Sequence, residues 1–148
     1  ERDTVVLNLS EGHKTVENLK ARGAFTVGIA DAAHMVEADY FGLVSGHQVP
    51  DKLGKARLTA TKAEMVDAPV INELPLCMEC EFVAYQDGPY GCGVIGKVVS
   101  VTADERVLTD GKVDMTKVDA IAFDPYTYGY YKVTERVGNA FQDGAKLK

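Results

Sequence analysis

Two long alternating segments joined by a turn constrain the fold of this chain most. They are Leu74–Gln86 and Tyr90–Ala103, and Asp87-Gly88-Pro89 lies between them. In the first segment every second residue from Leu74 to Ala84 is apolar, which is the period-two spacing of a strand with one apolar face. Asp, Gly and Pro are the residues that tight turns favour. The pattern therefore predicts a long β-hairpin.

Shorter segments around this hairpin predict more strands than helices. Ser10 and Asp31 are suitable N-caps for two short helices, and Gly23 is a suitable end for the first of them. Since strands joined by tight turns outnumber alternating strand–helix units, we expect an antiparallel sheet or barrel, mainly β with short helices. The segments are strands at 4–9, 24–30, 121–123 and 128–133, helices at 14–21 and 32–43, and a polar stretch at 137–148 that packs through Phe141.

Length and charge exclude several classes of protein. The chain has 148 residues, is 46% hydrophobic and carries a formal net charge of −6. A chain of this length buries roughly 68–70% of its unfolded surface, so one core needs no metal or disulfide. The acidic balance disfavours nucleic acid. Its apolar runs are far shorter than the roughly 20 residues that cross a bilayer. We expect neither nucleic acid nor membrane as a partner.

The three cysteines favour structural roles. An odd number in a chain of this length favours a reducing, cytoplasmic location. Cys77 and Cys80 have the spacing of a redox pair or half a zinc site. On a strand, however, positions three apart face opposite ways, so the two thiols diverge. We expect Cys80 in the core and Cys77 on the more polar face, while Cys92 is uninformative.

Polar residues gather where the first strand leads into the first helix. Free backbone N–H groups and the positive end of the helix dipole attract anions there. The Lys14 ammonium and the Thr15 hydroxyl suit a phosphate. The alternative is simple capping, in which Ser10 caps the helix and Lys14 is solvated. The chain has no GxGxxG, P-loop, GxSxG or HExxH motif that would decide between them.

A series of short motifs extends in a fixed order across nearly the whole chain. Each motif is weak alone, but their order and spacing are specific. The motifs are LNLS at 7–10, HKTVENL at 13–19, GAFTVGI at 23–29, ADYFG at 38–42, SG at 45–46, DK at 51–52, APVI at 68–71, CE at 80–81, IGKVV at 95–99, YY at 130–131, GNAF at 138–141 and Gly144. Together they resemble the flavin reductase-like family of FMN-binding split barrels, in its flavoredoxin-type branch.

The resemblance implies a six-stranded antiparallel split β-barrel that forms a homodimer, with FMN near the subunit interface. Carried over by position, Asn8 and Ser10 would line the flavin side of the first strand. Lys14 and Thr15 would meet the phosphate, and Asn18 would brace the turn.

A loop later in the chain would lie beside the cofactor. It contains Ser45, Gly46 and the Asp51-Lys52 pair. Family members carry further strands before the position of Thr4, and those strands contact the flavin ring. We therefore expect residues 1–148 to be a single flavin reductase-like domain that lacks its N-terminal strands.

The implied activity is that of an FMN-dependent oxidoreductase or electron carrier. Electrons would pass from NAD(P)H or a donor protein, through FMN, to an acceptor. Because the cofactor supplies the chemistry and the protein orients it, we nominate no catalytic side chain. The alternative is a non-enzymatic split-barrel binding or interaction module that has lost its flavin.

Four tyrosines, Tyr126, Tyr128, Tyr130 and Tyr131, form a second aromatic group. Period two places the first three on one strand face and Tyr131 on the other. They could stack on flavin or close a dimer. The simpler interpretation is strand packing with the hydroxyls at the rim.

Overall fold

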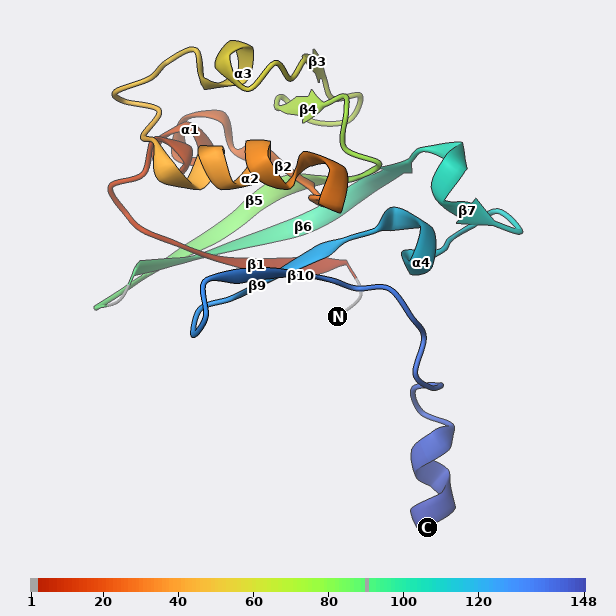
Figure 1. Cartoon of the computed structure of the whole chain (residues 1–148). Coiled ribbons are helices and arrows are strands. Elements are labelled where there is room, and N and C mark those ends of the chain that lie inside the picture. The colour runs from red at the N-terminus through yellow and green to blue at the C-terminus, as the bar shows by residue number, and fades with distance from the viewer. Residues whose placement is uncertain (1–2, 90) are drawn as a thin grey trace.

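A four-stranded antiparallel sheet in the order β1-β6-β5-β2 forms the centre of the fold (Figure 1). The computed structural model describes residues 3–89 and 91–148. Strands β5 (Leu76–Gly88) and β6 (Gly91–Ala103) form the predicted hairpin. Strand β1 (Thr4–Leu9) pairs with β6, and β2 (Ala24–Gly28) pairs with β5. Tyr90, where the second predicted strand began, lies outside the described residues.

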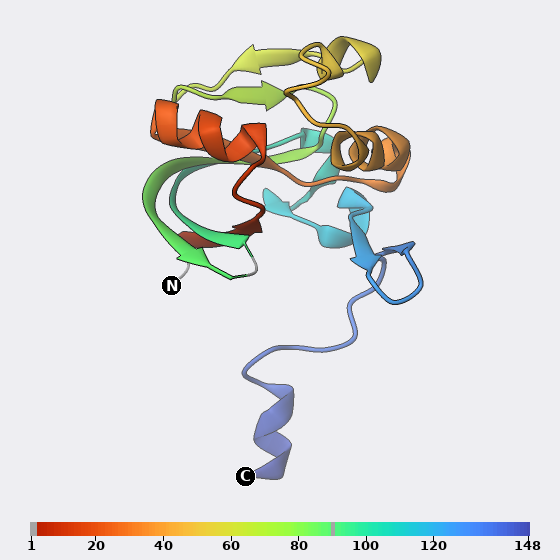
Figure 2. The ribbon, with the colours of Figure 1, turned by 90° about the vertical axis from the view of Figure 1, so that its left-hand side faces the viewer.

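Two irregularities bend the long hairpin. The pairing of β5 with β6 shifts between Glu79 and Cys80 and again between Phe82 and Ala84. Such bulges increase the local twist and bend a strand. After the second shift Tyr85 joins Phe82 against the core, so the alternation predicted up to Ala84 ends there. Figure 2 shows the resulting curl of β5 and β6.

Helix α1 (Lys14–Arg22) packs against one face of this sheet. Its buried side chains, Val16 and Leu19, belong to one core cluster with Cys80 and Val94. Gly23 ends the helix in the left-handed region at φ 67°, as predicted.

The predicted N-cap at Ser10 is wrong. His13 is the N-cap residue of α1 and makes no side-chain capping bond. The Ser10 carbonyl instead accepts the His13 N–H at 3.0 Å, which closes a turn before the helix. The hydroxyl of Ser10 therefore lies one turn too early to meet the free N–H groups of α1.

Close packing of an aromatic ring against the sheet requires a glycine. Phe25 of β2 lies over Gly96 of β6, and a Cβ at position 96 would lie 2.3 Å from the ring. Such a contact is impossible without displacing Phe25. Gly96 therefore allows β2 and β6 to share the core.

The segment after β2 is helical, as predicted, but in two parts. A 3₁₀ turn, η1 (Ala32–His34), precedes α2 (Met35–Leu43). Asp31 caps the 3₁₀ turn η1, because its carboxylate accepts the His34 N–H at 2.9 Å. Beyond α2 lie the short helix α3 (Lys52–Lys55) and an antiparallel pair, which form the upper layer of Figure 1. The pair consists of β3 (Ala60–Lys62) and β4 (Pro69–Ile71).

The C-terminal half of the body adds small elements beside the sheet. The turn η2 (Glu105–Val107) and helix α4 (Met115–Val118) bury Val107 and Val118 together. Within the described residues the strands do not close into one ring. The architecture is mainly β with short helices, which confirms the predicted fold class. The remaining strands form two pairs: β7 (Leu108–Thr109) with β8 (Lys112–Val113), and β9 (Ile121–Asp124) with β10 (Gly129–Lys132).

The C-terminal segment does not pack through Phe141, so that prediction is wrong. It extends away from the body and ends in a 3₁₀ turn, η3 (Asp143–Leu147), as Figures 1 and 2 show. The Phe141 side chain is fully exposed, and Leu147 is 94% exposed. The hydrogen bonds of this C-terminal segment are local, such as that from the Asn139 N–H to Asp143 Oδ2 at 2.7 Å. Local bonds hold this shape without apolar burial.

Both cysteines of the CxxC are buried. Cys80 lies in the core as predicted, and Cys77, on the other face of the strand, is also buried at 3% exposure. Glu79, on the same face as Cys77, is also buried, because the segment between β3 and β4 covers it. The Glu79 carboxylate accepts the N–H groups of Met65 at 2.7 Å and Glu64 at 3.4 Å.

Candidate functional site

A cavity of about 840 Å³ lies between the start of α1 and the segment that joins α2 to α3. The ends of β3 and β4 form its remaining wall. Its polar lining comes from α1 and from the segment after α2. These residues are His13, Lys14, Thr15, Asn18, Ser45, Gln48 and Lys52.

The structure brings together most of the predicted cofactor-binding residues. Lys14, Thr15 and Asn18 on α1 face the same cavity as Ser45, Gly46 and Lys52. Asn8 and Ser10 do not line it. Asn8 is exposed on β1, whose alternate residues Leu7 and Leu9 pack against the core. Strand alternation therefore turns Asn8 away from α1 and its cavity.

Lys14 is the cationic group at the start of α1, and it already has a partner. Its ammonium is bonded to the carboxylate of Glu17, one turn further along the helix. The second Glu17 oxygen lies 3.7 Å from Nε2 of His47. The hydrogen bond from Lys14, and then the charges of Lys14 and His47, lower the pKa of Glu17 below its usual value. Glu17 is therefore an anion that holds Lys14 at the rim of the cavity.

Gly46 brings the segment after α2 against the side chain of Lys14. A Cβ at position 46 would lie 3.1 Å from Lys14 Cβ and 3.2 Å from its Cγ. The same segment is held by its own turn, in which the His47 N–H donates to Ser45 Oγ at 3.2 Å. Ser45 and Gly46 thus form a wall whose position depends on Lys14.

Lys52 holds the end of α2. Its ammonium donates to the carbonyls of Phe41 at 2.7 Å and Val44 at 2.6 Å, and it lies 5.2 Å from the centre of the Phe41 ring. A cation at the end of a helix satisfies carbonyls that have no helical partner. Burial lowers the pKa of Lys52. Lys52 therefore shapes the cavity through α2, and its contact with a ligand stays a prediction.

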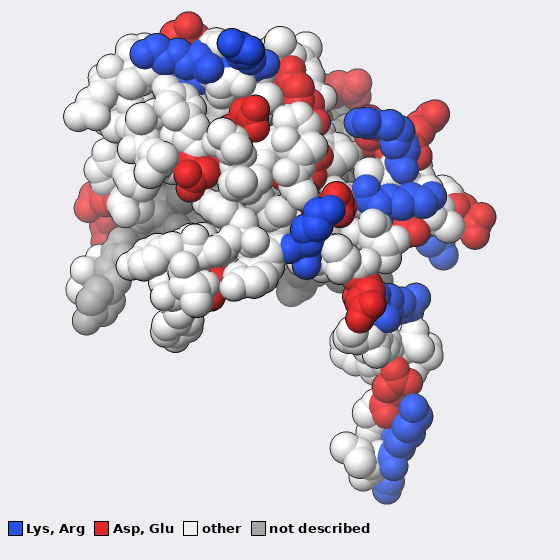
Figure 3. All heavy atoms as spheres, viewed as in Figure 1, with Lys and Arg blue, Asp and Glu red and all other residues white. Residues whose placement is uncertain are grey.

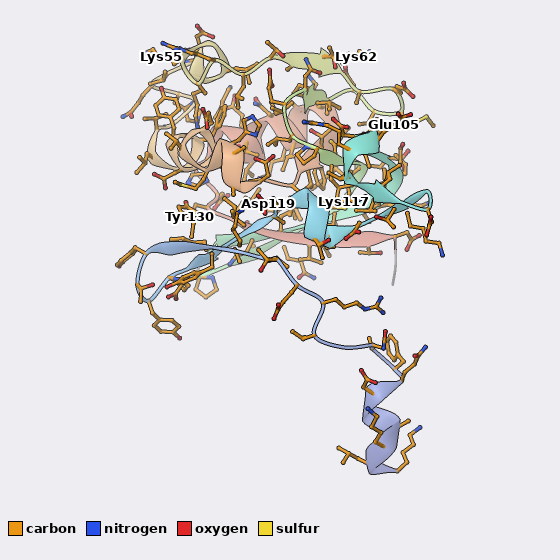
Figure 4. The ribbon with its side chains drawn as sticks, turned by 45° about the vertical axis from the view of Figure 1, so that its right-hand side comes forward. Lys55, Lys62, Glu105, Lys117, Asp119 and Tyr130 are labelled. Carbon is orange, nitrogen blue, oxygen red and sulfur yellow. The ribbon has the colours of Figure 1, made fainter. Side chains whose placement is uncertain are left out.

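A second cavity of about 620 Å³ adjoins the first along α1. The two share Thr15, Asn18, Ala60 and Pro69. A salt bridge from Arg22 Nη1 to Asp67 Oδ2, at 2.7 Å, crosses its wall. Lys62 (labelled in Figure 4) lies 3.6 Å from the other Asp67 oxygen. Sequence reasoning missed these residues because no local motif links Arg22 to Asp67.

The cysteines and tyrosines lie apart from these cavities. Burial raises the pKa of both Cys77 and Cys80, which disfavours reactive thiolates. Among the described residues, no group of three His, Cys, Asp or Glu side chains could hold a metal ion. The tyrosines line neither cavity.

The tyrosines do not form one strand face, which corrects that prediction. Tyr126 and Tyr128 lie in the turn between β9 and β10 and are 92% and 81% exposed. Tyr130 (Figure 4) donates its hydroxyl to Asp39 Oδ1 of α2 at 2.9 Å, and this bond raises its pKa. Its rim hydroxyl therefore joins the β9–β10 pair to α2.

Comparison with known families decides the relationship. A family model described as the flavin reductase like domain matches residues 3–131. The chain belongs to the flavin reductase-like family. A comparison with curated protein sequences finds no match. The family assignment confirms the resemblance seen in the motifs.

Solved structures of flavin reductase-like proteins have the same fold. The flavoredoxin of Desulfovibrio vulgaris (Miyazaki F) is 34% identical with a TM-score of 0.89, and the match covers 95% of this chain and 75% of that one. A flavoredoxin from Methanosarcina acetivorans is 30% identical with a TM-score of 0.86, covering 98% of this chain and 75% of that one. These two matches confirm the similarity to the flavoredoxin branch.

A more distant structure shows the fold alone. It is an FMN-binding domain of a flavin reductases-like enzyme from Shewanella baltica OS155, 16% identical with a TM-score of 0.76. The match covers 92% of this chain and 73% of that one. In the described part of our chain, no helix has both the length and the hydropathy needed to cross a membrane.

Proposed function

We propose that this chain binds FMN in the cavity at the start of α1 and serves as a flavoprotein oxidoreductase. The observation that carries the proposal is the placement of Lys14, Thr15 and Asn18 around one cavity in a flavin reductase-like chain. A volume of about 840 Å³ falls in the range of small-molecule sites. The names of the two flavoredoxins and of the FMN-binding domain support a flavin as the ligand.

The residues present fit the phosphate end of FMN. The start of α1 offers backbone N–H groups with no helical partner, and the Thr15 hydroxyl adds a neutral donor. Lys14 supplies the positive charge. Asn18, one turn after Lys14, can brace the ligand from the same helix face. We propose that these three side chains hold the phosphate.

The other residues of the cavity would position the flavin. Ser45 and Gly46 form the wall opposite α1, and Lys52 fixes the end of α2 behind it. Bound FMN would supply the acceptance and release of one or two electrons. The protein's task is then to orient the flavin and leave one route open for an electron donor.

We propose NAD(P)H or a donor protein as the source of electrons. The similarity to two structures named flavoredoxin supports an electron carrier as the first candidate. A reductase fed directly by a nicotinamide is the second candidate, favoured by the family's name. Anaerobic visible spectra of the FMN-loaded protein distinguish them: NADH or NADPH alone bleaches the flavin of a reductase, whereas the flavin of a carrier stays oxidised until a donor protein is added. A protein that takes up no FMN would contradict both.

We propose that the chain forms a homodimer through its exposed apolar surface. Figure 3 shows few charged side chains over the β9–β10 pair. Exposed aromatic residues there include Phe123, 52% exposed, with Tyr126 and Tyr128. Exposed aromatic patches commonly mark protein interfaces. Light scattering during gel filtration should give twice the chain mass, and the mass of one chain at micromolar concentration would contradict this proposal.

A cytoplasmic location is part of the proposal. The thiols of Cys77 and Cys80 are both free in the structure. A reducing compartment preserves free thiols. Fractionation of cells that express the tagged protein should find it with cytoplasmic markers, and recovery from a secreted fraction would contradict this location.

A further inference from the structure

We propose that Glu17 is a built-in competitor for the phosphate site. Its carboxylate binds the Lys14 ammonium until the phosphate of a ligand displaces it, so residue 17 sets the affinity of the site for phosphate-bearing ligands. The inference rests on the proposed function for the identity of the flavin. Its anion component can be tested without any flavin.

The first support is the geometry of the pair. Lys14 lines the cavity, whereas Glu17 does not. The bond between them therefore pairs the ammonium with a carboxylate that lies outside the cavity lining. A phosphate that binds those N–H groups needs the same ammonium, so it competes with Glu17 for Lys14.

The second support is that Glu17 has another partner to turn to. Its Oε2 lies 3.7 Å from Nε2 of His47, on the segment that carries Gly46. When Lys14 turns to a phosphate, Glu17 can stay beside His47 and keep this segment near α1. The exchange therefore moves one ammonium and leaves the wall of the cavity in place.

The third support is the modest strength of the pair. The Lys14 and Glu17 side chains are 38% and 56% exposed, and ion pairs of this exposure are weak. A phosphate dianion carries more charge than a carboxylate, so it can win the ammonium. The Glu17 charge nevertheless stays close to the ligand and repels it. Removing that charge should raise phosphate affinity about three- to tenfold at low salt, and less at high salt.

The test compares FMN with riboflavin, which lacks the phosphate. Glu17→Gln keeps the size of the side chain and removes its charge. Quenching of flavin fluorescence should show FMN bound about three- to tenfold more tightly by this variant than by the wild type, with riboflavin unchanged. Glu11→Gln is the matched control, because it removes the same charge just before α1 without a bond to Lys14. It should change FMN affinity by less than about twofold.

Inorganic phosphate separates this inference from the proposed function. Phosphate binding, followed by the chemical shifts of the N–H groups at 14–16, should also tighten in Glu17→Gln. If phosphate behaves in this way but FMN does not bind the wild type, the proposed function fails while the competition stands. An unchanged or weaker phosphate and FMN affinity in Glu17→Gln would overturn the inference. An equal gain for riboflavin and FMN would also overturn it.

Discussion

Gly46 lies so close to Lys14 that a Cβ at position 46 would approach Lys14 Cβ to 3.1 Å. This contact joins the segment after α2 to the start of α1, where the phosphate site is proposed. Because the approach is tighter than ordinary van der Waals contact, Gly46→Ala must displace Lys14 by a few tenths of an ångström or move the wall. We expect FMN affinity to fall about threefold or more, measured by fluorescence titration.

The matched control for Gly46→Ala is Gly12→Ala. A Cβ at position 12 would meet nothing within 4 Å, although Gly12 also lies near the start of α1. FMN affinity should therefore stay within about twofold of the wild type. Equal losses in the two variants would contradict the role of the Gly46–Lys14 contact.

Lys52 gives a prediction about stability. Lys52→Met removes the donor to the Phe41 and Val44 carbonyls, while its apolar stem remains. The free energy of unfolding should fall by about 1–2 kcal/mol, since hydrogen bonds from a charged donor to partly buried carbonyls contribute on this order. Urea unfolding measures the change. The control is Lys55→Met, on the exposed side of α3, which should change the free energy of unfolding by less than about 0.5 kcal/mol. A stable Lys52→Met protein with weak FMN binding would instead make Lys52 a direct ligand.

Glu79 should behave as a structural carboxylate. Both of its oxygens accept backbone N–H groups from the segment between β3 and β4. Glu79→Gln replaces one acceptor by an NH₂ group, which leaves a buried N–H without a partner. Unfolding should become easier by about 2 kcal/mol. Glu81→Gln, two residues further along β5 and exposed, serves as the control. Similar stabilities of the two variants would show that the carboxylate does not hold this segment.

Local patterns predicted the parts of the fold that depend on local physics. The β5–β6 hairpin follows from period-two alternation and a turn sequence, and α1 ends at Gly23 because glycine tolerates a positive φ. Cys77 was assigned to a polar face because Glu79 shares that face. Its burial depends on a distant segment whose backbone satisfies Glu79, and no periodicity within β5 encodes that contact.

The candidate site divides in the same way. Lys14 and Thr15 could be predicted because a helix start has a local signature, whereas Asn18 was implied only by the family resemblance. The Arg22–Asp67 salt bridge joins residues that only the tertiary fold brings together. Phe141 misled the prediction, because an aromatic residue in a polar stretch was assigned to the core. Its neighbours instead satisfy one another locally, which leaves the ring in solvent.

Asp114 provides a prediction about pH. Its carboxylate accepts from the hydroxyls of Thr116 and Thr109 and from the Thr116 N–H, and these bonds lower its pKa below the ordinary 3.8. A carboxyl whose pKa is lower in the folded state stabilises the fold above its unfolded pKa. That contribution is lost as the pH falls through the folded value. The stability gap between the wild type and Asp114→Asn should therefore be present at neutral pH and shrink below about pH 3.8.

Urea unfolding of both proteins across this pH range measures the gap. Glu105→Gln, which changes a carboxyl of the neighbouring turn η2, is the control for the general effect of acid. The difference in free energy of unfolding between Glu105→Gln and the wild type should stay small across the whole pH range. A gap for Asp114→Asn that is constant from neutral to acidic pH would contradict the assigned cause.

The central claim is that the start of α1 binds the phosphate of FMN, and a paired titration tests it most directly. FMN and riboflavin are titrated into the wild type, into Lys14→Ala/Thr15→Ala and into Lys55→Ala as a control. We predict that the wild type binds FMN more tightly than riboflavin. The double variant should lose about tenfold or more of its FMN affinity, with riboflavin affinity unchanged. A wild type that binds no FMN, or a double variant that binds FMN as tightly as the wild type, would contradict the claim.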